Sequence, residues 1–125
     1  MIIGIGVDSI EIRRVAVAIQ RHPRLKARLY TCGELHQVPL GAKAASRLAS
    51  LFAAKEAIFK ALGTGLAGHS WQQVEVLHNA AGAPVVYLHD QAKSTAADLK
   101  VARIHLSLAH DRGRALAFCI AEGME

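Results

Sequence analysis

The chain has 125 residues, of which 52% are hydrophobic and only 5% aromatic, so we expect a single domain over residues 1–125 with an aliphatic, alanine-rich core. Its formal net charge of +5 at pH 7 favours an acidic partner, such as a phosphate compound or an acidic protein. The sequence has neither the start of a signal peptide nor the run of roughly 18 apolar residues that a membrane span needs. We therefore expect a cytoplasmic protein with no membrane partner.

The first part of the chain predicts one strand followed by short helices. Residues 2–7 are apolar and rich in isoleucine and valine, which is typical of a strand buried on both faces. From Ser9 the apolar residues recur at helical spacing, and Pro23 ends that helix because proline disfavours helical geometry in the residue before it. A short helix is expected over 24–29. Thr31, with a glutamate three residues later, then matches the capping box of a third helix.

The longest helix is predicted from Ala42 to about Leu62, where alanine, leucine, lysine and arginine dominate. Gly63 and Gly65 mark its end, since glycine tolerates the left-handed conformation found after helix C-termini.

The rest of the chain reads mainly as antiparallel strands. A hairpin is predicted from 74–77 and 85–88, a helix at 91–99, and two further strands at 103–108 and 115–121. This order predicts an α+β fold with an N-terminal strand, helices including one long helix, and a mostly antiparallel sheet.

Two carboxylates stand in otherwise apolar, small-residue sequence: Asp8, after the first strand, and Glu56, inside the long helix. A bound divalent cation would remove the cost of burying an unpaired charge, so the pair indicates a magnesium site that handles phosphate. The alternative is a plain one, because acids at strand ends are usually solvated. Lys60 also lies four residues after Glu56, where it would form a simple helix-supporting ion pair.

Other residues suit phosphate or a charged partner. Lys55, Lys60 and the amides of 63–65 are expected to bind phosphate oxygens, and His110 ends a strand, although a structural role for it is equally expected. The basic segment 13–28 is either a solvated surface or a docking face for an acidic protein. Nucleic-acid binding would need aromatic platforms or a known module, so we expect no nucleic-acid partner. A dinucleotide site is excluded because the third glycine is missing after Gly4-Ile5-Gly6.

Four blocks of the sequence together resemble the holo-[acyl-carrier-protein] synthase family, the small 4′-phosphopantetheinyl transferases. The second block, FAAKEAIFKALGTG, is the most specific, and together the blocks span nearly the whole chain in the family's order. They lie at 4–14, 52–65, 71–76 and 105–111.

The resemblance implies transfer of phosphopantetheine from coenzyme A to a serine of an acyl carrier protein, with release of adenosine 3′,5′-bisphosphate. Asp8 and Glu56 match the family's magnesium ligands, and Lys60 matches a lysine that steadies the diphosphate or protonates the leaving phosphate. Either a water on the metal or Glu56 accepts the serine proton, and the sequence leaves both open.

The resemblance also implies partners and an assembly, namely an acidic carrier protein and a homotrimer with active sites between subunits. The positions that match the nucleotide side of the family's site are Gly63, Thr64, Gly65 and His110. Those that match its basic carrier-docking helix are Arg14, Arg21 and Arg24.

The chain departs from the family at Leu51, where an arginine associated with the 3′-phosphate of coenzyme A is usual. Lys43 and Arg47 are the basic residues left nearby, and we hypothesise that Arg47, four residues earlier on the helix, supplies the missing charge. Altered cofactor preference, weaker activity, or service to a carrier of secondary metabolism instead of fatty-acid synthesis are the alternatives. A non-catalytic carrier-protein or nucleotide-binding protein of the same fold is the rival hypothesis.

Overall fold

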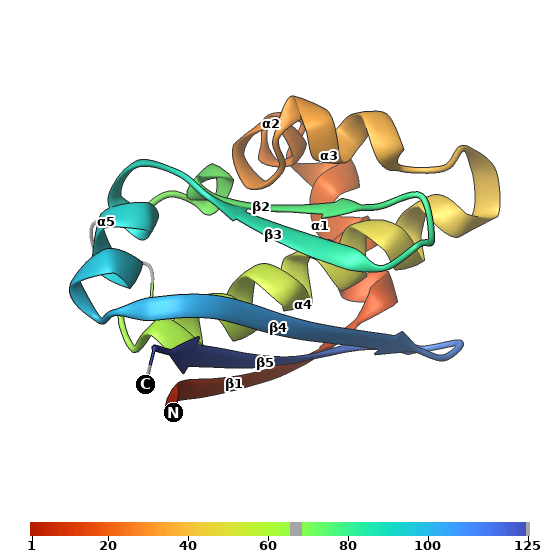
Figure 1. Cartoon of the computed structure of the whole chain (residues 1–125). Helices are drawn as coiled ribbons and strands as arrows, with labels where there is room; N and C mark the ends of the chain where they lie inside the picture. Colours follow the sequence, from red (N-terminus) through yellow and green to blue (C-terminus); the bar gives the residue numbers. More distant parts are fainter. Residues whose placement is uncertain (66–68, 125) are drawn as a thin grey trace.

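The computed structural model describes residues 1–65 and 69–124 and confirms the predicted α+β fold (Figure 1). Its helical elements are α1 (Ile12–Arg21), α2 (Leu25–Leu29), α3 (Cys32–Gln37), η1 (Gly41–Lys43), α4 (Ala44–Leu62), η2 (Trp71–Gln73) and α5 (Asp90–Asp98).

The strands form two antiparallel sheets. Strands β1 (Ile2–Glu11), β4 (Val101–His110) and β5 (Arg114–Gly123) form a three-stranded sheet in the order β1-β5-β4. Strands β2 (Val74–His78) and β3 (Pro84–Leu88) form the predicted hairpin. In Figure 1 the long helix α4 runs between the hairpin and the three-stranded sheet, and it contacts strands of both.

The first strand is longer than the sequence predicts. Ser9 and Ile10 pair with Leu116 and Ala115 of β5, so Asp8 lies within the strand and helix α1 begins only at Ile12. The prediction that this strand is buried on both faces is also wrong for the single chain. Its outward face is open, with Ile5 and Val7 exposed at 55% and 50%.

Local capping signals are confirmed. The Thr31 hydroxyl accepts a hydrogen bond from the amide of Glu34 at 3.1 Å, and the Thr31 amide donates to Glu34 Oε1 at 2.8 Å, which completes the capping box. Helix α4 ends at Gly63, whose φ of +74° is the left-handed conformation that glycine adopts at low cost.

Helix α4 packs unusually close to β1 because the strand presents glycines to it. A Cβ added to Gly4 would lie 1.9 Å from the carbonyl oxygen of Ala61, and one added to Gly6 would lie 1.8 Å from that of Ala57. We call these four residues the glycine seam. Beside it, the inward side chains of β5 are also small; they are Ala115, Ala117, Cys119 and Ala121, all fully buried.

Candidate active site

The glycine seam brings Asp8 and Glu56 together. Along the seam, two residues of the strand cover about 6.6 Å and four residues of the helix cover about 6 Å. Strand and helix run in opposite directions, so every second strand residue meets every fourth helix residue. Since Gly4 meets Ala61 and Gly6 meets Ala57, the next inward strand residue, Asp8, reaches the helical turn that carries Glu56.

Lys60 joins this pair from one helical turn further along α4. Its ammonium donates a hydrogen bond to the Val7 carbonyl oxygen at 3.0 Å and lies 3.4 Å from Asp8 Oδ1. The Lys60 side chain is 51% exposed, whereas that of Asp8 is 17% exposed. The structure therefore brings together the three residues expected to be catalytic: Asp8, Glu56 and Lys60.

The electrostatics of this cluster are only partly balanced. Burial raises the pKa of Glu56 above its ordinary value, the nearby Asp8 carboxylate raises it further, and Lys60 opposes both effects. The two carboxylates are thus close enough to repel each other, and one half-exposed lysine lies beside them.

The carboxylate pair, Asp8 and Glu56, lines a cavity of 540 Å³ between β1, α1 and α4. Phe52 and Trp71 form part of the apolar lining, and their ring centroids lie 4.9 Å apart; we call these two residues the aromatic wall. Cavities that combine an apolar wall with a few convergent charges are typical ligand sites. Arg14, expected to dock a carrier protein, also lines this cavity.

Sequence reasoning gave no individual site role to several of the cavity residues. Trp71 was named only as part of a block that resembles the family. It is the single tryptophan of a chain poor in aromatic residues, and this scarcity could have marked it as a candidate site residue. Arg114 gave no signal, because it reaches the cavity by donating to Ser9 Oγ at 2.9 Å from a strand 105 positions away.

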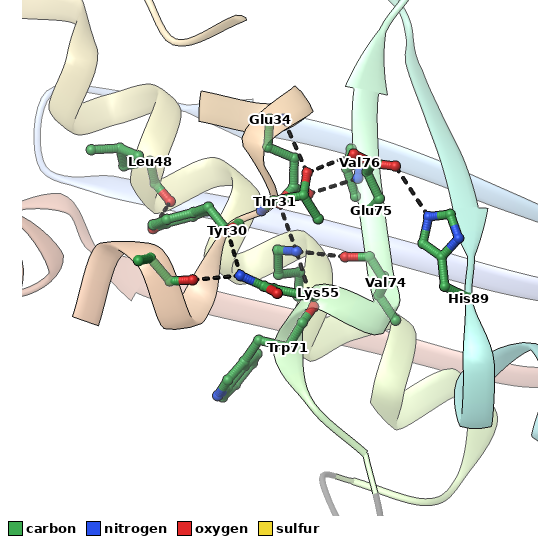
Figure 2. A network of polar contacts seen from close by, with 12 residues as sticks. Tyr30, Thr31, Glu34, Leu48, Lys55, Trp71, Val74, Glu75, Val76 and His89 are labelled. Carbon is green, nitrogen blue, oxygen red and sulfur yellow. Dashed lines mark hydrogen bonds and ion pairs between the residues drawn. The ribbon is translucent and has the colours of Figure 1, made fainter. Parts of the chain in front are cut away.

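Lys55 was expected to bind phosphate, and the structure contradicts this. Its side chain is completely buried, and its ammonium lies 2.8 Å from Glu34 Oε1 (Figure 2). It also donates to the carbonyl oxygens of Trp71 and Val74. An ammonium has three donors, so in this structure none is left for a phosphate.

Two of the three expected amide donors at the end of α4, those of Gly63 and Thr64, are also already used. The Gly63 amide donates to the Lys60 carbonyl at 3.0 Å and the Thr64 amide to that of Phe59 at 3.4 Å, while the Thr64 hydroxyl donates to the Gly65 carbonyl at 3.3 Å. The C-terminal end of a helix is moreover the negative end of its dipole. The expectation that the Gly63 and Thr64 amides bind phosphate is therefore wrong for this conformation.

The remaining expected nucleotide ligands lie away from the carboxylate pair. Lys43 and Arg47 are at the start of α4, and 13 residues of helix, about 20 Å, separate Arg47 from Lys60. Arg47 donates to the Gln37 carbonyl at 3.2 Å on the side of α3. His110 is exposed at the end of β4, and β5 lies between it and β1.

The expected carrier-docking residues extend from the cavity along an exposed surface. Arg14 and Arg21 are seven residues apart in α1, so they share one face of that helix. Arg24 follows in the turn before α2 and lines a second hollow of 380 Å³ with His22 and Arg28.

The described residues contain no group of three or more histidine, cysteine, aspartate or glutamate side chains arranged to hold a metal ion. In the same described part of the chain, no helix is both long enough and apolar enough to cross a membrane.

A family model described as the 4′-phosphopantetheinyl transferase superfamily matches residues 4–119. The holo-[acyl-carrier-protein] synthase of Alkaliphilus metalliredigens is 43% identical over 122 residues, which cover 97% of this chain and 99% of the relative.

Solved structures agree over the same length. The Plasmodium yoelii acyl carrier protein synthase with ADP bound has a TM-score of 0.91 and 29% identity, covering 100% of this chain and 98% of that one. A Bacillus anthracis holo-(acyl-carrier-protein) synthase in complex with coenzyme A (3′,5′-ADP) has a TM-score of 0.83 and 29% identity, covering 99% of both chains.

Proposed function

The chain belongs to the 4′-phosphopantetheinyl transferase superfamily, and from this we propose how its carboxylate pair serves the family reaction. The enzyme transfers the 4′-phosphopantetheine group from coenzyme A to a serine of an acyl carrier protein and releases adenosine 3′,5′-bisphosphate. The observation that carries the site assignment is the convergence of Asp8, Glu56 and Lys60 beside the 540 Å³ cavity.

The carboxylate pair is proposed to hold Mg²⁺. The donor set fits, because magnesium prefers oxygen ligands and needs only one or two carboxylates when waters and substrate phosphates complete its shell. Burial and, after it, repulsion by Asp8 raise the pKa of Glu56, and a cation at this place would relieve both effects. When bound, the ion supplies charge neutralisation for the diphosphate oxygens during transfer.

Lys60 is proposed to bind the diphosphate of coenzyme A. Its ammonium is half-exposed and lies beside Asp8, so it is placed to bind an incoming phosphate while it stays next to that carboxylate. Lysine acts on phosphate as a flexible point charge, which suits a group whose charge changes position during transfer.

Arg47, Lys43 and His110 are proposed to serve the nucleotide end of coenzyme A. Leu51, which stands where relatives usually carry an arginine, is 2% exposed and belongs to the core, whereas Arg47 is only partly buried. Arg47→Ala should therefore raise the Michaelis constant for coenzyme A. An unchanged constant would end the idea that Arg47 replaces the missing arginine.

Arg14, Arg21 and Arg24 are proposed to dock the acidic helix of the carrier protein. Reversing the charge at an exposed position, as in Arg21→Glu, should raise the Michaelis constant for the carrier and leave that for coenzyme A unchanged. If both constants rise equally, the basic face has another role.

A homotrimer is proposed on the strength of the outward face of the three-stranded sheet. Ile5, Val7, Leu116 and Phe118 are exposed at 55%, 50%, 44% and 43%, and the strand register places Val7 opposite Phe118. Contiguous exposed apolar surface of this kind marks an interface. Because Val7 and Asp8 are neighbours on opposite faces of β1, a subunit docked on this face would lie directly behind the active site.

The assembly is tested by measuring the molar mass in solution by light scattering. The wild-type chain should have three times the mass of a monomer, and Phe118→Glu should dissociate it. A monomeric wild-type chain at micromolar concentration rejects the trimer.

The reaction is tested by incubating the protein with an apo-carrier, coenzyme A and Mg²⁺ and weighing the carrier. A gain of about 340 Da, the mass of the transferred group, is expected, and it should disappear with EDTA and return with added Mg²⁺. Fatty-acid and secondary-metabolism carriers tested in parallel would identify the physiological class. The mechanism is rejected if EDTA has no effect on the rate. A cytoplasmic location remains a prediction from the sequence.

A further inference from the structure

Lys55 precedes Glu56 in the chain, and its side chain points into a buried junction of polar groups (Figure 2). Its ammonium donates to the carbonyl oxygens of Trp71 at 3.0 Å and Val74 at 2.5 Å, and it lies 2.8 Å from Glu34 Oε1. All three donors of the ammonium are thereby satisfied.

Glu34 is likewise bonded through both of its carboxylate oxygens. Besides Lys55, its carboxylate accepts hydrogen bonds from the amide of Thr31 at 2.8 Å and from the amide of Val76 at 2.7 Å. The pair therefore joins helix α3, helix α4 and the η2–β2 segment at one buried point.

The η2 segment held by this junction carries one half of the aromatic wall. The carbonyl of Trp71 turns towards Lys55, while its indole ring points away from the junction (Figure 2). The ring instead lies 4.9 Å, centroid to centroid, from that of Phe52. Both rings line the cavity that Asp8 and Glu56 also line.

We propose that Lys55 is a positioning residue that holds the aromatic wall at the distance from the carboxylate pair that coenzyme A requires. Lys55 thus fixes the aromatic wall, while Glu56, the next residue of the same helix, belongs to the carboxylate pair on which the reaction depends. The inference rests on the proposed function for the identity of the ligand, but the position of Trp71 can be measured without any transfer.

Trp71 provides the measurement, because it is the only tryptophan of the chain. In Lys55→Met its emission maximum should move to longer wavelength and its quenching by acrylamide should increase. The Michaelis constant for coenzyme A should rise about tenfold while kcat changes less than about threefold, since the lost contact orders the binding cavity rather than the reacting atoms.

A matched control is Ile104→Ala on β4, which removes packing on the inward face of the sheet, away from the cavity. This variant should lower the melting temperature but leave both the Trp71 emission and the Michaelis constant unchanged. It separates a positioning effect from general destabilisation.

Glu34→Gln is the second variant, in case Lys55→Met does not fold, because it keeps the volume and one acceptor of the junction. It should shift the emission and the Michaelis constant in the same direction by a smaller amount. A folded variant of either kind with unchanged emission and unchanged Michaelis constant overturns the proposal, and so does a loss confined to kcat.

If neither variant folds, hydrogen exchange of the wild-type protein decides the matter. Coenzyme A should slow exchange at residues 71–76, and unchanged exchange there overturns the proposal. Failure of the wild-type chain to add mass to any carrier would reject the proposed function instead, and the emission shift of the folded variants would still report on the junction.

Discussion

Lys55 and Glu56, consecutive residues of α4, place opposite charges in two contrasting environments. Burial lowers the pKa of Lys55, but Glu34 opposes this shift by its charge and by a hydrogen bond, and every donor of the ammonium has a partner. The pKa of Glu56 is raised by burial and by the nearby Asp8 carboxylate, and the half-exposed Lys60 opposes both effects.

The contrast separates a structural charge from a functional one. A buried ion with all its hydrogen bonds made holds neighbouring elements in a fixed arrangement, whereas an incompletely balanced pair beside a cavity is poised to bind a ligand. If this contrast is right, changes at the Lys55 junction should mainly lower stability, and changes at the carboxylate pair should mainly lower the rate.

The largest effect is expected at the carboxylate pair. Asp8→Asn or Glu56→Gln should lower kcat/KM for transfer by about 10³-fold, about 4 kcal/mol, because one charged group of a preorganised site is lost. The melting temperature should stay the same or rise, since either change removes repulsion between the two acids. A rate within tenfold of wild type, or a clearly lower melting temperature, would contradict this assignment.

The buried junction should show the opposite pattern. Lys55→Met leaves the Glu34 carboxylate buried without its cation, which costs about 3–5 kcal/mol of unfolding free energy. Urea denaturation measures this loss. Adding Glu34→Gln should restore part of it, because no unpaired buried carboxylate remains, and a double variant less stable than Lys55→Met would refute this explanation.

The glycine seam should affect both stability and rate. In Gly6→Ala the new methyl group meets the Ala57 carbonyl oxygen at 1.8 Å, so strand and helix must separate, at a cost of about 1–3 kcal/mol. Transfer should slow by about 10²-fold because Asp8 moves away from Glu56. Gly113→Ala is the matched control, since its methyl group meets nothing closer than Asp111 Oδ1 at 4.0 Å, and it should change neither measurement.

The smallest effect is expected at Glu75, beside the junction. Burial would raise the pKa of Glu75, but hydrogen bonds with Thr31 and His89 outweigh burial and hold that pKa below its ordinary value of 4.5. A carboxyl whose pKa is lower in the folded state stabilises the fold above about pH 4.5, and this contribution disappears as the pH falls through the folded pKa.

Glu75→Gln should therefore be less stable than wild type by about 1 kcal/mol or less at pH 5 and above. Thermal unfolding measured between pH 5 and pH 2 should show this difference shrinking towards zero. A difference that stays constant over that range would show that the hydrogen bonds of Glu75 do not depend on its charge.

The sequence predicted the features that depend on neighbouring residues. The capping box of Thr31 and Glu34 and the helix end at Gly63 are both present, because each is formed by hydrogen bonds within a few positions. The predicted end of β1 was wrong because the last residues of the strand pair with β5, as Ser9 does with Leu116. No local sequence pattern indicates a partner so distant in the chain.

The same limit applies to the site residues. Lys55 and Lys60 flank Glu56 in one motif, yet their roles are set by partners remote in sequence, Glu34 and Trp71 for the first and Asp8 for the second. The sequence paired Asp8 with Glu56 through the cost of burying unpaired carboxylates and through the family resemblance, but it did not show what brings the two residues together in space. That feature is the glycine seam, where missing side chains bring two backbones together.

This seam gives one side of the cavity a fixed backbone geometry. Because backbone atoms of β1 and α4 meet there directly, no change of rotamer at the seam can widen the gap between the two backbones that carry Asp8 and Glu56. The opposite lining, which includes Val15, Leu25 and Leu29, is built only from side chains that can be exchanged. Attempts to redesign which coenzyme A derivatives are accepted should therefore begin with that lining.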